Sequence, residues 1–250
     1  MKKSFALITL GAILEYYDFA IFIYFAKNIG ESLIPIHNET ANLIASFGVL
    51  AIGALLRPLG GTIFAHFGDT RGRKNIFVYT VLMMALPTFT IGLIPSYAQI
   101  GIGATIILIL LRCIQGLAIG GEIPGSVVFA YELSNKQNKA LNTNIVIAGT
   151  NIGFFAASML GAILLNQKNL PCEAWRIAFF IGGIFGVISY YLRKNLMETP
   201  EFSQYQQFIN KQPHPPVKEL WINYKKPLFQ MLAFGSLLAS SLAVFTFFMP

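Results

Sequence analysis

Two carboxylates, Glu15 and Asp18, lie within the first long apolar stretch of the sequence. They are three residues apart, so on a helix they share one face, and Tyr17 lies beside them. Ionised groups are costly in hydrocarbon, and two carboxylates on one apolar face repel each other. The sequence therefore predicts that one of them holds a proton near neutral pH, which suits a proton carrier. A structural alternative stays open, in which Asp18 binds a neighbouring cation or backbone group and Glu15 is a polar anchor.

A second group of polar residues interrupts a later apolar stretch. Gln115 and Glu122 are seven residues apart and lie on one helical stripe, with Arg112 beside it. A buried guanidinium with a carboxylate ten residues further on could bind a substrate carboxylate, or exchange partners when a proton moves. The alternative is that Arg112 only caps polar backbone groups near the membrane surface.

A third group lies at a short loop and at the end of a later apolar stretch. It consists of Asp69, Gly72, Arg73, Lys74 and Glu132. Glycine permits the sharp turn that so short a loop needs, and Arg73 and Glu132 are expected at the same membrane surface. Their ion pair would contribute about 1 kcal/mol or less, yet a pair present in one conformation only can bias an equilibrium. The alternative is a charge cluster that only sets topology. We expect Arg57 to reach toward this cluster.

The elements that position these groups are predicted to be membrane-spanning helices. Hydrophobic residues make up 55% of the 250 residues and charged residues 12%, so the chain cannot cover itself with polar surface. The fold class is therefore all-α and polytopic. Apolar stretches predict six spans, an outer loop at 27–41 and a seventh span, and Trp175 is expected as an interfacial anchor. The spans are 5–26, 42–67, 76–94, 101–132, 144–165, 175–192 and 228–249.

The net charge of +7 is distributed as in a membrane protein. Basic residues gather in alternate connecting segments, among them Arg73-Lys74 and Arg193-Lys194, which places the N-terminus in the cytoplasm and argues against nucleic acid as a partner. Cys113 and Cys172 show no metal or disulfide pattern. The sequence has no phosphate-binding loop or nucleophile motif, so neither an enzyme nor a cofactor is expected.

Several short motifs carry a resemblance to a known family. The segment Gly68-Asp69-Thr70-Arg71-Gly72-Arg73-Lys74 resembles the loop between helices 2 and 3 of the major facilitator superfamily. The segment 112–116 (RCIQG) resembles the fourth-helix motif of the same superfamily, and the segments 57–61 (RPLGG), 15–19 (EYYDF) and 120–122 (GGE) are similar to its metabolite:proton symporter branch. The resemblance implies two six-helix halves with the substrate between them, proton coupling through Arg112, and a conformational latch at Asp69.

The resemblance also sets the expected organisation and function. Residues 1–194 form an N-terminal six-helix bundle, 195–227 a cytoplasmic linker, and 228–250 the first helix of an incomplete C-terminal bundle. The expected protein is a symporter of the bacterial inner membrane with the proton as its coupling ion and no cofactor. Its substrate would be a proline- or betaine-like osmolyte or a small carboxylate, with its cationic group facing Tyr17 and Tyr24.

Two interpretations of the chain's length stay open. It could act in the lipid bilayer with a separately encoded C-terminal half. It could instead be a non-transporting remnant, a membrane sensor or an assembly partner.

Overall fold

The computed structural model describes residues 2–167, 169–196, 198 and 222–248. Every regular element within these ranges is an α-helix, and six of the helices are long and apolar enough to cross a membrane. The predicted fold class, an all-α multi-pass membrane protein, is therefore confirmed. The helices are α1 (Lys2–Tyr24), α2 (Ala26–Leu33), α3 (Glu39–Arg71), α4 (Arg73–Leu93), α5 (Tyr97–Ile100), α6 (Ile102–Glu132), α7 (Lys139–Asn166), α8 (Ala174–Lys194) and α11 (Lys225–Phe248).

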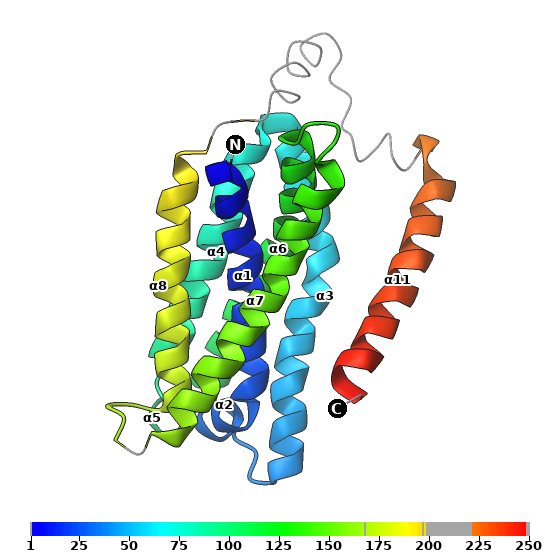
Figure 1. Ribbon diagram of the computed structural model, residues 1–250. Helices are drawn as coiled ribbons and strands as arrows, with labels where there is room; N and C mark the ends of the chain where they lie inside the picture. The colour runs from blue at the N-terminus through cyan, green and yellow to red at the C-terminus, as the bar shows by residue number, and fades with distance from the viewer. Residues whose placement is uncertain (1, 168, 197, 199–221, 249–250) are drawn as a thin grey trace. The chain divides into compact units, whose positions relative to one another are not determined.

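The chain divides into two compact units, residues 1–205 and 206–250. The first unit is a helix bundle in which α3 packs on α6, α1 on α7, and α4 on α8, while α6 also contacts α4 and α1 (Figure 1). The second unit contains α11. We call the end of the bundle that holds Gly72 the Gly72 end, where α1, α4 and α7 begin and α3, α6 and α8 end, and the other end the Ser96 end.

Glycines bring the paired helices into backbone contact. A Cβ atom added to Gly116 of α6 would lie 2.0 Å from the carbonyl oxygen of Gly53 on α3, and one added to Gly120 would lie 2.0 Å from that of Arg57. Such distances leave no room for any side chain at these positions. The helix α7 approaches α1 in the same way, because a Cβ at Gly153 would lie 2.3 Å from the Ile13 oxygen.

The bundle has an apolar outer surface and polar groups inside. Large hydrophobic side chains such as Leu55, Leu110 and Phe155 are exposed, as expected for a surface that meets lipid. Five charged side chains of the described residues are instead buried between the helices, together with the amides of Asn42 and Gln115. The five are Glu15, Asp18, Arg112, Glu122 and Arg193. Because each buried charge needs a partner, their pairing identifies the part of the bundle where chemistry is possible.

Two local expectations differ from the structure, and a third is not tested by it. The predicted outer loop 27–41 contains α2, which forms because Ala26, Ile29 and Leu33 are buried on one face. Trp175 is buried in the core rather than anchored at an interface. The predicted linker 195–227 lies largely outside the described residues, which resume at Ile222.

Candidate functional site

Asp18 and Arg112 form a buried ion pair between α1 and α6. The Asp18 Oδ2 atom lies 2.5 Å from Arg112 Nη1, and each side chain is only 4% exposed. Gln115 Nε2 and Thr88 Oγ1 donate hydrogen bonds to Asp18 Oδ1 over 3.1 and 2.9 Å. Three helices, α1, α4 and α6, therefore supply one polar network around a single carboxylate.

Arg112 keeps unused hydrogen-bonding capacity in this network. Its guanidinium lies 4.1 Å from the ring centroid of Phe22, but its Nε and Nη2 atoms have no hydrogen-bond partner among the described residues. Sequence spacing suggested Glu122 as a partner for Arg112, and the structure shows a different pairing. Ten residues along one helix correspond to about 15 Å, too far for a direct ion pair, so Arg112 pairs across to α1 instead.

Glu15 lies one helical turn from Asp18, toward the Gly72 end. It is buried like Asp18, so the predicted shared face is present, but their surroundings differ. Asp18 is paired with a cation, whereas the buried Glu15 Oε2 has no hydrogen-bond partner in the part of the chain that the structure describes. The two carboxylates are therefore equivalent in sequence pattern and different in environment.

The expectation that Arg57 reaches the surface cluster is wrong. Its guanidinium carbon lies 5.5 Å from the ring centroid of Phe19 and lines a hollow beside Asp18 and Arg112. Arg57 is fourteen residues from Arg71 at the end of α3, which is about 21 Å along the axis. An arginine side chain cannot cover that distance, so Arg57 belongs to the central site.

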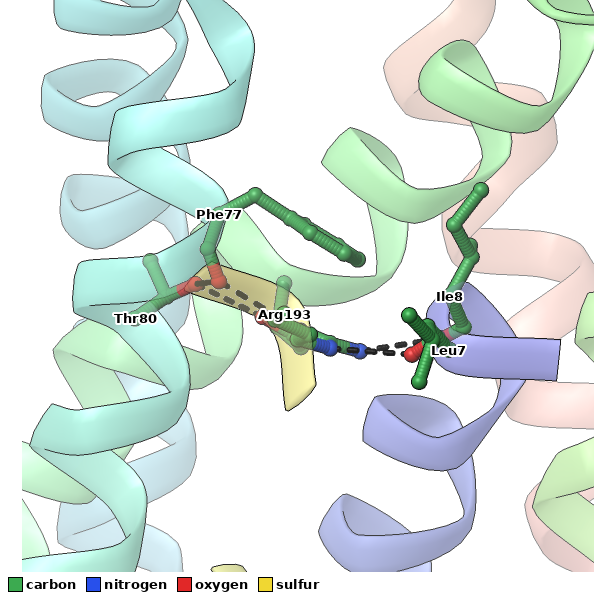
Figure 2. Close-up of polar contacts among 6 residues, drawn as sticks. Leu7, Ile8, Phe77, Thr80 and Arg193 are labelled. Carbon is green, nitrogen blue, oxygen red and sulfur yellow. Dashed lines mark hydrogen bonds and ion pairs between the residues drawn. The ribbon is translucent and has the colours of Figure 1, made fainter. Parts of the chain in front are cut away.

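A second buried ion pair joins Glu122 of α6 to Arg193 of α8. Glu122 Oε1 lies 2.6 Å from Arg193 Nη1, and both side chains are fully buried. Figure 2 shows that Arg193 reaches α1 and α4 at once: it donates to the carbonyl oxygens of Leu7, Ile8 and Phe77 over 3.0, 2.9 and 3.3 Å. Thr80 donates to Glu122 Oε2 over 2.6 Å. Four helices thus meet at this pair.

Arg193 was missed by the sequence reasoning, which placed it among the charges of a connecting segment. The helix α8 continues to Lys194, so Arg193 is still helical and turns inward. Gly11 makes the space, because a Cβ at that position would lie 1.8 Å from Arg193 Nη2. Two features of the sequence could have pointed to a buried cation: Gly11 in the first apolar stretch, and Glu122, which has no evident partner on its own helix. Neither feature identifies Arg193 as that cation.

The third group lies at the Gly72 end as expected. Gly72 has φ of 102°, a conformation that favours glycine, and it separates α3 from α4. Arg73 bridges two carboxylates, Asp69 at 3.3 Å and Glu132 at 2.5 Å, so the predicted Arg73–Glu132 pair is present.

The first turn of α4 binds a further carboxylate at this end. The backbone N–H of Lys74 donates to both oxygens of Glu198, over 3.2 and 3.1 Å. A carboxylate at a helix N-terminus is favourable because it meets free N–H groups and the positive end of the helix dipole. The side chains of α3, α4 and α6 and the segment after α8 are therefore linked at the Gly72 end.

Tyr17 is directed away from the hollow that Arg57 lines. Its hydroxyl donates to the carbonyl oxygen of Ala178 on α8 over 2.9 Å, and its ring is buried. Tyr24, its suggested companion in binding a cation, is 40% exposed and packs edge-on against Phe25. The two tyrosines therefore occupy separate surroundings.

A comparison with family models decides what kind of protein this is. The model described as Major Facilitator Superfamily matches residues 8–250. The chain belongs to this superfamily. The superfamily consists of transporters rather than enzymes, which agrees with the expectation drawn from the motifs.

Curated relatives are similar over most of this chain. A protein of Staphylococcus aureus (strain COL), named as a candidate proline/betaine transporter, is 38% identical over 206 residues, which are 80% of this chain and 44% of that protein. The proline/betaine transporter of Salmonella typhimurium is 35% identical over 208 residues, 82% of this chain and 42% of its own length. The chain thus spans less than half the length of these two relatives.

Solved structures of the superfamily share the fold. The proton:xylose symporter bound to 6-bromo-6-deoxy-D-glucose superposes with a TM-score of 0.72 at 14% identity, over 82% of this chain and 46% of its own. The inward-open xylose transporter from E. coli gives a TM-score of 0.71 at 14% identity, over 98% of this chain and 56% of its own. At this identity the likeness supports the fold alone.

Proposed function

We propose that this chain acts as the N-terminal half of a proton-coupled symporter for a small polar metabolite, a proline- or betaine-like osmolyte or a small carboxylate. The observation that carries the proposal is the Asp18–Arg112 ion pair, which is buried between the membrane-spanning helices α1 and α6. A buried charge pair is costly to maintain in hydrocarbon and marks ion pathways in membrane proteins. The names of the curated relatives support the substrate class.

The geometry supports a role for the pair in proton coupling. When Asp18 Oδ2 takes up a proton, the ion pair to Arg112 Nη1 is lost while Gln115 and Thr88 still hold the other carboxyl oxygen. Arg112 then has more unbonded donors and no counter-charge, so it must find a new partner. A conformation in which Arg112 has a new partner is then favoured, so proton uptake by Asp18 is linked to a change of conformation. Of the two roles suggested for Arg112, the structure supports the exchange of partners.

The cluster at the Gly72 end suits a latch between conformations. Arg73 holds α3 and α6 together through Asp69 and Glu132, and all three side chains are partly exposed. Each contact alone contributes little, so the cluster can open without a large barrier. We assign it the role of stabilising one state of an alternating-access cycle.

The membrane and orientation belong to the same proposal. Basic side chains gather at the Gly72 end, where Arg71, Arg73, Lys74, Lys139 and Lys194 lie, whereas Lys27 and Arg176 lie toward the Ser96 end. This asymmetry supports a cytoplasmic Gly72 end in a bacterial inner membrane. A second six-helix half, encoded in this chain's protein or separately, would supply the other wall of the pathway.

Uptake into proteoliposomes tests the proposal. The vesicles contain this chain together with a second six-helix half, and glycine betaine, proline and 2-oxoglutarate are offered with an inward proton gradient. Uptake should stop when a protonophore collapses the gradient and should fall sharply in Arg112→Ala. Arg71→Ala, which removes an exposed arginine of the same charge, should transport normally. Uptake that persists without the gradient would refute proton coupling, and no uptake of any solute would favour a sensor.

A further inference from the structure

A hollow between α1, α3 and α6 lies beside the central ion pair. Phe19, Arg57, Asp18, Arg112 and Gln115 are among the residues that line it. Two of these side chains carry a guanidinium, and they differ in what they already bind. Arg112 is engaged by Asp18. Arg57 makes no ion pair among the described residues, and its buried Nε atom has no hydrogen-bond partner there.

Arg57 is held so that its charged end stays available. The backbone at Arg57 is pressed against Gly120 of α6, which fixes the start of the side chain. The guanidinium lies over the ring of Phe19 and is partly exposed. A planar guanidinium with free N–H groups binds a carboxylate through two parallel hydrogen bonds. A charge within a membrane span is costly and marks functional sites, and the position of Arg57 beside a hollow fits a ligand-binding role.

An aromatic cluster adjoins this guanidinium. Tyr16 and Phe19 of α1 and Phe154 of α7 have ring centroids 5.2 to 6.5 Å apart, and all three rings are only partly buried. Tyr16 and Phe154 therefore offer further ring surface beside the ring that Arg57 contacts. Aromatic faces attract quaternary and other alkylated ammonium groups. A carboxylate receptor and a cation receptor thus lie next to each other.

We propose that Arg57 binds the carboxylate of a small zwitterionic substrate while Tyr16, Phe19 and Phe154 contact its ammonium group. This inference rests on the transport function proposed above and names the substrate class of the same site. In this arrangement Arg57 binds the substrate carboxylate, and Arg112 stays paired with Asp18. A molecule such as a betaine, with both charges a few atoms apart, matches the arrangement better than an anion or a cation alone.

Protection from arginine-specific modification tests the site without transport or a proton gradient. The full chain in lipid nanodiscs is treated with phenylglyoxal, and modification of each arginine is followed by mass spectrometry. Three probes are compared: glycine betaine has both charges, acetate has the carboxylate only, and choline has the quaternary ammonium only. Arg71 is a matched internal control, because it lies on the same helix, over the ring of Phe67 at 5.0 Å, and is exposed outside the hollow.

Glycine betaine should slow modification of Arg57 and leave that of Arg71 unchanged. Acetate should protect Arg57 only at higher concentration, and choline should not protect it. Phe154→Leu removes a ring of the cluster other than the one beneath Arg57. It should raise the half-protecting concentration of glycine betaine about two- to thirtyfold, the range expected for a lost cation–π contact, and leave that of acetate unchanged.

Three outcomes would overturn the inference. They are the absence of protection of Arg57 by glycine betaine, equal protection of Arg57 and Arg71, and equal protection by glycine betaine and choline. Equal protection by acetate and glycine betaine would remove the aromatic part of the site. The protection assay needs no proton gradient, so it tests the binding site separately from proton coupling. If glycine betaine protects Arg57 but uptake does not depend on the gradient, proton coupling is refuted and the binding site is still supported.

Discussion

Replacing Arg193 with methionine is expected to destabilise the bundle strongly. The substitution keeps a long side chain but leaves the fully buried Glu122 carboxylate with Thr80 as its remaining hydrogen-bond donor among the described residues. Removing one partner of a buried ion pair costs about 3–5 kcal/mol, because the other charge stays desolvated. The carbonyl groups of Leu7 and Ile8 lose little, since they lie inside α1 and keep their helical hydrogen bonds.

The companion change is Glu122→Gln, alone and together with Arg193→Met. The amide keeps a hydrogen bond to Thr80, so in the double variant no buried charge is left without a partner. We expect the double variant to lose less than the two single variants added together, by about 2–3 kcal/mol. A difference of 1.4 kcal/mol is a tenfold change in the unfolding equilibrium, so this coupling is readily measured.

The assay is unfolding of the purified full chain by SDS in mixed micelles, followed by circular dichroism. Lys194→Met is the matched control, because it removes the same charge from the next residue, which is exposed. It should leave the midpoint nearly unchanged. Strictly additive losses in the double variant, or equal losses in Arg193→Met and Lys194→Met, would refute the view that this pair joins four helices.

Three further predictions follow from other contacts. Gly116→Val should lower the unfolding free energy by at least about 1–3 kcal/mol, since its Cβ would lie 2.0 Å from a carbonyl oxygen of α3. The control Gly125→Val has open space around it and should lower the unfolding free energy little. Asp69→Asn should slow transport and leave substrate binding intact, and equal loss of both would contradict the latch. The hydrogen bond with Glu39 raises the pKa of Lys27, so the stability that this pair contributes should be present at neutral pH and be lost as the pH rises through that raised pKa. Because both side chains are exposed, Lys27→Met should barely shift the unfolding midpoint at either pH.

The membrane spans could be predicted from sequence because hydrocarbon thickness sets their length and composition. Apolar stretches located all six long helices, although the structure extends most of their ends by a few residues, as in α3 from Glu39 to Arg71. The predicted loop 27–41 was partly wrong because α2 is too short and too polar to stand out from a loop. Its helical character depends on burial against α3.

The ionisable residues could be found from sequence, but their partners could not. A charge in an apolar stretch is conspicuous, which is why Glu15, Asp18, Arg112 and Glu122 were recognised. Pairing depends on how each helix is rotated and which helices touch, and spacing along one helix contains neither. Arg193 shows the limit most clearly, because a basic residue near the end of a span is indistinguishable in sequence from a surface charge.

Transport by an Asp18→Asn variant is the most direct test of proton coupling at the central pair. Asparagine keeps an oxygen for Gln115 and Thr88 but cannot exchange a proton. In proteoliposomes that contain this chain and a second six-helix half, the variant should still exchange labelled for unlabelled substrate, but it should not accumulate substrate against its concentration gradient when a proton gradient is imposed. Accumulation equal to that of the unsubstituted protein would contradict the assignment of Asp18 as the proton-binding group.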